Sequence, residues 1–219
     1  MQEQAVGQQI VGPTRTHFTT RSGTLARWAM GTPMIFRRNS EIYGEAEPVE
    51  YVYEVAHGAV RTVKVLSDGR RQIGGFYFAG DIFGLEHGNG HSFSAEAVVD
   101  STVLMTRRSS LIGMAGHDHE LAQQLWIVTA QQAARAHNHA LMLIKTAQER
   151  VNSFLLEMTE RIASGDLIKL PMSRQDIADY LGIAIETVCR ALTSLEMRSA
   201  IAMPNSRAVR LRDRSMLTE

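Results

Sequence analysis

Apolar and polar positions alternate over short stretches in the first half of the chain. Within residues 34–108, segments such as EYVYEV (50–55) and AVRTVKVL (59–66) are rich in β-branched and aromatic residues and are separated by glycines. This alternation predicts strands with one buried face, and Ser-Asp-Gly at 67–69 predicts a hairpin turn. Many short strands without a helical crossover predict an antiparallel β-roll or barrel. Residues 1–30 are polar and poorly periodic, which indicates an arm or a short first helix.

A helical period replaces this alternation at residues 118–145. The segment holds no glycine or proline. At the α-helical rise it would extend about 40 Å, too long to be buried by one small domain. We predict one long helix that pairs with a second copy in a parallel dimer, and packing on the chain's own roll is the alternative. Its apolar stripe begins with Leu121, Leu125 and Val128 and resumes with Leu141, Ile144, Ala147 and Val151.

A second helix is predicted over residues 148–162, and residues 170–197 are then predicted to form two short helices joined by a tight turn. Ser173 is a suitable N-cap, Asp176 stands where it completes a capping box, and Gly182 supplies the turn. This is the helix-turn-helix layout, in which the second helix enters the major groove of DNA by its N-terminal end. The inward positions are Ile177, Ala178, Leu181, Val188, Ala191, Leu192 and Leu195.

The second of these helices would expose polar side chains near its N-terminal end. The Glu186 carboxylate can accept from the amino group of cytosine, and the Arg190 guanidinium can donate to O6 and N7 of guanine. Each such contact is worth about 1–3 kcal/mol of discrimination. A solvated surface ion pair between the same two residues, four apart on one helix face, is the alternative. The exposed set comprises Ile185, Glu186, Cys189, Arg190 and Ser194.

Residues 200–213 contain two short apolar stretches around Pro204-Asn205, which predicts a β-wing. The chain carries 23 basic and 23 acidic residues, which excludes a binder of nucleic acid through bulk positive charge. Residues 186–214 nevertheless contain six arginines against three acids, a local excess of three positive charges. Four arginines would lie on or near the wing, beside a phosphate backbone: Arg207, Arg210, Arg212 and Arg214.

Composition limits the remaining possibilities. Hydrophobic residues make up 44% of the chain, enough for a packed core, and the single cysteine excludes a disulfide framework or an all-cysteine metal site within one chain. No apolar run approaches the roughly 20 residues of a membrane span and no secretory signal is visible, so we expect a cytoplasmic protein without a membrane partner. Phosphate-loop, HExxH and GxSxG motifs are absent from the sequence, so no enzyme is predicted.

The order of a glycine-punctuated roll, a long helix and a winged helix-turn-helix unit resembles the CRP/FNR family of bacterial transcription regulators, over residues 30–213. The E-T-V-x-R pattern of the second short helix is most similar to FNR- and FixK-like members. The resemblance implies an α+β fold with an antiparallel, cyclic-nucleotide-binding-like β-roll in residues 1–116, a dimerisation helix in 117–145 and a winged helix-turn-helix domain in 146–219. The matching elements are Gly58, Gly69, Gly80-Asp81, Gly84, SRQDIADYLG and ETVCRAL.

The resemblance also implies partners and contacts. It implies a homodimer that binds double-stranded DNA at a palindrome of TTGA-type half-sites. It further implies an activator that touches RNA polymerase through exposed segments near residues 67–71 and 164–170. Base reading is implied for Glu186, Arg190, Ile185 and Cys189, the last standing where the subgroup commonly has serine, and phosphate contact for Ser173, Arg174, Thr187 and Arg207.

Departures from the family pattern argue against its sensor chemistries. FNR-type oxygen sensors bind an iron–sulfur cluster through several cysteines, most of them near the N-terminus, and this chain has none there. Cyclic-AMP receptors use a Glu, an Arg and a Thr-Ser pair, and the matching positions here are Leu85, Phe93 and Arg135-Ala136. Without a buried arginine a cyclic phosphate would be desolvated and unpaired, so no cofactor is predicted. Ala184 also replaces the usual Ser or Thr N-cap of the second short helix.

Two further features carry alternatives. Cys189, beside Arg190, is either a small contact residue or a redox-sensitive thiol whose oxidation blocks DNA binding by bulk and charge. Histidine pairs at spacings of two and four residues fit loop and surface positions better than a metal or haem site, so no metal is predicted. A regulator that senses haem, a metal or an unidentified effector in the roll is the alternative. The pairs are His87/His91, His117/His119 and His137/His139.

Overall fold

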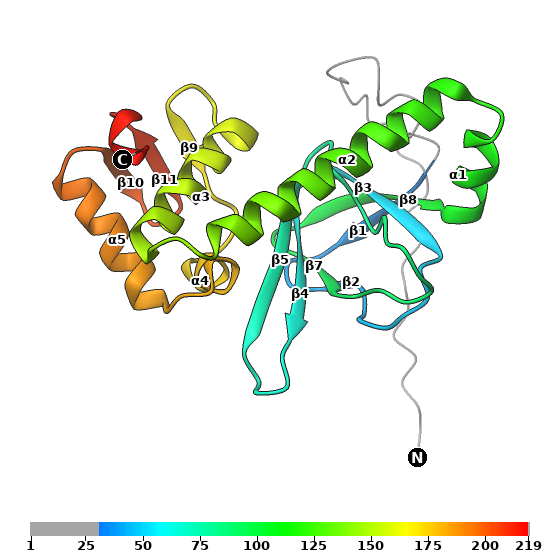
Figure 1. Ribbon diagram of the computed structural model, residues 1–219, viewed down its shortest axis with the longest axis horizontal. Helices are drawn as coiled ribbons and strands as arrows, with labels where there is room; N and C mark the ends of the chain where they lie inside the picture. Colours follow the sequence, from blue (N-terminus) through cyan, green and yellow to red (C-terminus); the bar gives the residue numbers. More distant parts are fainter. Residues whose placement is uncertain (1–30, 219) are drawn as a thin grey trace.

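The computed structural model describes residues 31–218 and contains two units joined by a long helix (Figure 1). The arm or first helix expected in residues 1–30 lies outside the described residues. The first unit is a roll of two four-stranded antiparallel sheets, ordered β1-β8-β3-β6 and β2-β7-β4-β5. Its strands are β1 (Thr32–Phe36), β2 (Glu41–Tyr43), β3 (Tyr51–His57), β4 (Ala59–Val65), β5 (Arg71–Phe78), β6 (Ile82–Phe83), β7 (Ser94–Ala97) and β8 (Ser101–Arg107).

The strands and the hairpin predicted between residues 50 and 71 are confirmed. The predicted segments correspond to β3 and β4, and β4 pairs with β5 so that Val65 lies opposite Arg71 across the turn. Gly58, which separates β3 from β4, has a φ of 94°, and a Cβ there would lie 2.8 Å from the carbonyl oxygen of Asp100. Only glycine fits this backbone conformation and this close approach.

Helices follow the roll. α1 (Arg108–Ala115), a helix that the sequence pattern did not predict, leads from β8 into α2 (His119–Met142). Asp118 caps α2 by accepting hydrogen bonds from backbone N–H groups of its first turn, and the helix ends three residues before the predicted end at 145. α3 (Ala147–Ile162) follows a bend in the chain and begins with a capping box formed by Thr146 and Glu149.

One face of α2 covers the roll. Leu121 is buried together with Val52 and Ile82, and Leu125 and Val128 pack against the same cluster. The expectation that this part of the stripe faces a dimer partner is therefore wrong. Leu121, Leu125 and Val128 pack on the chain's own roll, the alternative that the sequence left open, whereas Leu141 and Ile144 are exposed.

The second unit contains α4 (Arg174–Leu181), α5 (Ile185–Met197), a short 3₁₀ helix η2 (Ser215–Leu217) and a three-stranded antiparallel sheet in the order β10-β11-β9. Pro204 and Asn205 lie inside β10, so the wing turn falls at residues 206–207, two residues later than predicted. The sheet comprises β9 (Leu167–Lys169), which was not predicted, β10 (Ile201–Asn205) and β11 (Ala208–Leu211). The seven inward positions predicted for α4 and α5 are all buried.

α4 lies between α5 and the roll, because it packs against α5 on one side and against strand β5 on the other. In Figure 1, α5 lies on the side of the second unit that is turned away from the roll. The roll therefore leaves the exposed face of α5 open. Within residues 31–218, the helices are all too short or too polar to cross a membrane.

Candidate nucleic-acid interface

α5 presents three of the predicted base-reading side chains to solvent. Glu186, Cys189 and Arg190 are exposed and Ile185 is half-buried, because the opposite face of the helix packs on α3 and α4. The helix begins after Ala184 with no side-chain cap, as the loss of the usual Ser or Thr predicts. An open N-terminal end with polar side chains on one face is the geometry that a helix needs to enter a major groove.

The Arg190 guanidinium is bonded to Thr187 rather than to Glu186. Nη2 of Arg190 donates to Oγ1 of Thr187 over 3.3 Å. No ion pair joins Arg190 to the Glu186 carboxylate, as far as the described chain extends. The surface ion pair that was the alternative to base reading is therefore absent from this structure. Both Glu186 and Arg190 retain hydrogen-bonding capacity toward a base edge.

Arg174, at the first position of α4, is a half-buried cation to which no acid is bonded within residues 31–218. Its Nη2 lies 3.6 Å from Sδ of Met203 in β10, and its Nη1 is buried without a hydrogen-bond partner. Burial lowers the pKa of Arg174, while the nearby Cys189 acts in the opposite direction. A guanidinium that has lost water and lacks an anion is stabilised when a phosphate oxygen reaches it. The start of α4, the wing and α5 converge at this residue.

Ser173 is committed to the cap of α4. Its Oγ donates to Oδ2 of Asp176 at 2.8 Å and accepts the backbone N–H of the same residue at 3.1 Å, which confirms the predicted capping box. A phosphate contact by the Ser173 hydroxyl would therefore compete with this cap. The role of Ser173 at DNA stays a prediction.

The wing arginines are placed unequally. Arg207 donates through Nη1 to the carbonyl oxygen of Pro171 at 2.8 Å, which holds the wing turn against the start of α4. Arg210 pairs with Asp166 at 3.1 Å, and Arg214 pairs with Glu160 of α3 at 2.8 Å. Such exposed pairs contribute about 0–1 kcal/mol and are screened by salt. Arg210 and Arg214 therefore share their charge with acids of their own unit.

The roll differs from the cyclic-nucleotide-binding pattern at two positions that the family resemblance identifies. The ring of Phe93 packs over Gly74, where a Cβ would lie 2.8 Å from it, and so fills the position at which an arginine would bind the phosphate. Arg135 of α2 donates to Asp81 at 2.9 Å. A small cavity of about 70 Å³ lies beside Tyr77, between β5 and helices α2, α3 and α4.

Two of the histidines are not at the surface. His91 is 3% exposed, its ring stacks on Tyr43 with centroids 3.6 Å apart, and its Nδ1 lies 2.9 Å from Oε1 of Glu86. His139 of α2 is half-buried and stacks on Tyr180 of α4 at 4.1 Å. His91 lies in the expected loop but is buried there, and His139 is only partly at the surface, because each is covered by an aromatic ring from a distant segment. The described residues contain no group of three or more His, Cys, Asp or Glu side chains suited to a metal ion.

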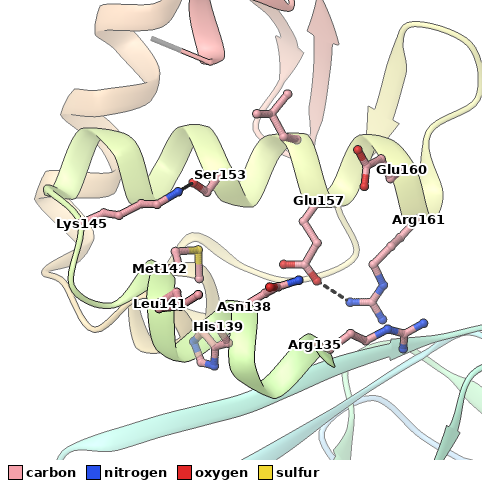
Figure 2. Close-up of a pocket in the computed structure, with 11 residues that line it drawn as sticks. Arg135, Asn138, His139, Leu141, Met142, Lys145, Ser153, Glu157, Glu160 and Arg161 are labelled. Carbon is pink, nitrogen blue, oxygen red and sulfur yellow. Dashed lines mark hydrogen bonds and ion pairs between the residues drawn. The ribbon is translucent and has the colours of Figure 1, made fainter. Parts of the chain in front are cut away.

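An open cavity of about 520 Å³ lies between the C-terminal half of α2 and α3 (Figure 2). Charged groups of both signs line it, and several are already bonded to each other. Arg161 donates to Glu157 at 2.8 Å, and Lys145 donates to Oγ of Ser153 at 3.0 Å. This lining does not favour one class of charged ligand.

Comparisons with known proteins agree with this geometry. Residues 33–118 match the cyclic nucleotide-binding domain family, and residues 149–219 match the Crp-like helix-turn-helix domain family. The chain is 50% identical over 195 residues to the nitrogen fixation regulation protein FixK of Azorhizobium caulinodans, which covers 86% of this chain and 79% of that protein. It is 40% identical over 175 residues to FixK of Rhizobium meliloti, which covers 80% of each.

A solved structure extends the comparison. FixK2 from Bradyrhizobium japonicum has a TM-score of 0.83 and 49% identity with this chain, and the match covers 86% of this chain and 96% of that one. The fold and the open recognition helix define a transcription regulator that binds DNA through a winged helix-turn-helix domain. The chain belongs to the CRP/FNR family and is a FixK-like member of it. The relatives named here are transcription regulators rather than enzymes.

Proposed function

We propose that the protein is a homodimeric activator that binds a palindrome of TTGA-type half-sites about one helical turn apart. The observation that carries the proposal is the open face of α5. There Glu186, Cys189 and Arg190 are exposed. The Arg174 guanidinium, whose Nη1 is buried without a hydrogen-bond partner, lies near Cys189. Base reading is assigned to Glu186 and Arg190, with Ile185 and Cys189 beside them. Phosphate contact is assigned to Arg174, Thr187, Ser173 and Arg207.

A second stripe on α2 supports the dimer. Five exposed positions follow one another at alternating intervals of four and three residues, on the side of the helix opposite to the positions that pack on the roll. Trp126 in this row is 76% exposed and Ile144, two residues beyond the end of α2, is 82% exposed, and large exposed apolar side chains favour a partner. The stripe comprises Trp126, Ala130, Ala133, His137 and Ala140.

Contact with RNA polymerase is supported by two protruding segments. Residues 67–70, at the tip of the β4–β5 hairpin, and residues 164–166, before β9, are exposed. Both fall within the segments for which the family resemblance implies contact with RNA polymerase. Because the target is DNA and its polymerase, we place the protein's action in the cytoplasm of a bacterium.

Selection of bound fragments from a pool of random double-stranded DNA tests the proposal. We expect enrichment of a TTGA-type palindrome, and we expect the affinity for this palindrome to be the same with and without cyclic nucleotide. Enrichment of unrelated single sites, or no enrichment, would contradict the proposed function. An absorption spectrum and a metal analysis of the purified protein test the alternative of a haem- or metal-sensing regulator.

A further inference from the structure

Asp176 attaches the DNA-binding unit to the roll. Its Oδ2 accepts hydrogen bonds from the backbone N–H and the hydroxyl of Ser173, inside α4, at 2.9 and 2.8 Å. Its Oδ1 accepts from two arginines of the roll, Nη1 of Arg61 at 2.9 Å and Nη2 of Arg71 at 2.6 Å. Only 3% of Asp176 is exposed. One buried carboxylate thus caps the first helix of the helix-turn-helix unit and also bonds that helix to β4 and β5.

Both arginines are also fixed by other acids. Arg61 donates to Glu96 of β7 through Nε at 2.9 Å and through Nη2 at 2.6 Å. Arg71 donates to Asp179, one turn further along α4, at 2.7 Å. Two points on α4 are therefore bonded to two neighbouring strands, which opposes rotation of α4 as well as its separation from the roll. We call Arg61, Arg71, Asp176 and Asp179 the arginine clasp.

A second set of contacts joins α2 and α3 to the roll, near the C-terminal end of α3 and away from the bend at residues 143–146. Arg161 of α3 donates to Asp81 at 2.8 Å and to the carbonyl oxygen of Phe76 at 2.6 Å. Arg135 of α2 donates to the other oxygen of Asp81. Figure 2 shows Arg135 and Arg161 extending from the two helices toward the same side. These contacts hold α2 and the end of α3 on the roll, and the clasp holds α4 on β4 and β5.

From these contacts we propose that Arg61 and Arg71 are positioning residues for DNA binding. The clasp sets the angle of each helix-turn-helix unit on its roll, and thereby the spacing between half-sites that the dimer accepts. The inference rests on the proposed function, because only two copies on one palindrome define a spacing. The clasp side chains lie on α4 and on the roll rather than on the exposed face of α5, so the reading of each half-site is left to Glu186 and Arg190.

Half-site spacing is a sensitive measure of this angle. One added base pair moves a half-site by about 3.4 Å along the DNA and turns it by about 35° around the helix axis. A unit held by the clasp can follow this displacement only by breaking buried ion pairs or by bending the DNA. A unit without the clasp is held to the roll by fewer ion pairs and follows the displacement at a lower cost.

The test measures the affinity of the full chain for palindromes built from the same half-sites, with the central spacer at its optimum, one base pair shorter and one base pair longer. The variants are Arg71→Gln, Asp179→Asn and the double change Arg61→Gln/Arg71→Gln. Arg70→Gln, which removes an exposed arginine of the same hairpin, is the matched control. We expect the ratio of the Kd values at altered and optimal spacing to fall by about fivefold or more in the clasp variants and to stay unchanged in the control.

An unchanged ratio in Arg71→Gln and Asp179→Asn overturns the inference, even if both variants lose affinity equally for all three sites, because an equal loss is a purely structural effect. Circular dichroism shows whether the double variant folds, and the two single variants decide the question if it does not. A wild-type protein that binds none of the palindromes refutes the proposed function and the inference together. A wild-type protein that binds with a spacing preference shared by all variants refutes the inference alone.

Discussion

Arg190 and Thr187 are joined by a hydrogen bond of 3.3 Å on the exposed face of α5. This bond uses one N–H group of the guanidinium and leaves others for a guanine edge. We expect Arg190→Ala and Glu186→Ala each to lower discrimination at one base pair of the half-site by about 1–3 kcal/mol. Titrations with the palindrome and with singly substituted sites measure this, and Arg37→Ala, an exposed arginine of the roll, is the control. Equal weakening on every sequence would contradict base reading.

Arg174→Gln is expected to act on all sequences alike. Because its guanidinium would neutralise one phosphate, the slope of log affinity against log salt concentration should become shallower by about 1. Specific and non-specific fragments should lose affinity by similar factors. The measurement is a salt series with both fragments, together with a thermal melt, since Arg174 is half-buried. A slope equal to that of the wild type would exclude Arg174 from the phosphate contacts.

Oxidation is expected to act through Cys189. This thiol is exposed and lies near Arg174, on the surface that we assign to DNA. Peroxide should weaken DNA binding by the wild type, because a sulfenic acid or a mixed disulfide adds bulk and charge there. Cys189→Ser should bind DNA nearly as well as the untreated wild type and should not respond to peroxide. Equal losses in the two proteins would leave Cys189 as a small contact residue only.

Acid is expected to weaken the attachment at Asp176. Burial opposes the ionisation of this carboxyl, but hydrogen bonds from Ser173 and the charges of Arg61 and Arg71 hold its pKa below the usual 3.8. A pKa that is depressed in the folded state contributes stability above the unfolded value, and that stability is lost as the pH falls through the folded-state pKa. The free energy of unfolding should therefore fall more steeply with acid in the wild type than in Asp176→Asn.

Urea titrations at neutral pH and at several values below 4 measure this difference. At neutral pH we expect Asp176→Asn to be less stable than the wild type by about 3 kcal/mol. This is the low end of the cost of breaking a buried ion pair, and we take it because Arg61 would still be paired with Glu96. Asp166→Asn, at an exposed carboxylate, is the control. Parallel acid profiles for the wild type and Asp176→Asn would contradict the assignment.

Ala133→Glu is expected to break the dimer. A carboxylate at the centre of the exposed stripe of α2 would face its own copy across the seam, and burying two like charges costs several kcal/mol. Sedimentation at several protein concentrations should show a dimer in the wild type and a monomer in the variant, with a matching loss of affinity for the palindrome. Gln131→Glu, which adds the same charge beside the stripe, should remain dimeric.

Local sequence signals were sufficient for the helix-turn-helix unit. Ser173 and Asp176 form the predicted cap, and Gly182 adopts the left-handed conformation, with a φ of 62°, that the turn needs. These features depend on residues only a few positions apart. β9 was missed because a strand of three residues is too short to show a period, and its partner β11 is distant in the sequence.

The contacts that fix the DNA-binding unit against the roll leave no comparable pattern in the sequence. Arg61 and Asp176 are separated by 115 positions, and each appears in the sequence only as a charged residue within an otherwise ordinary strand or helix. The direction of the α2 stripe was ambiguous for the same reason. Leu121 suits the roll and a partner helix equally well, and only tertiary packing decides between them. The burial of His91 likewise depends on Tyr43, which lies on β2, far from His91 in the sequence.

Two faces of α2 each have side chains that recur at seven-residue intervals. One face packs on the roll, and the other is the exposed stripe that includes Ala133. An α-helix turns by about 100° per residue, so inserting one residue would turn both faces of the following half out of register. Inserting a whole heptad would restore both faces but would move the second unit by about 10.5 Å along the helix axis, beyond the reach of the clasp. The number of residues in α2 is therefore constrained as strictly as their chemical character, and natural variation in this helix should consist of substitutions rather than changes in length.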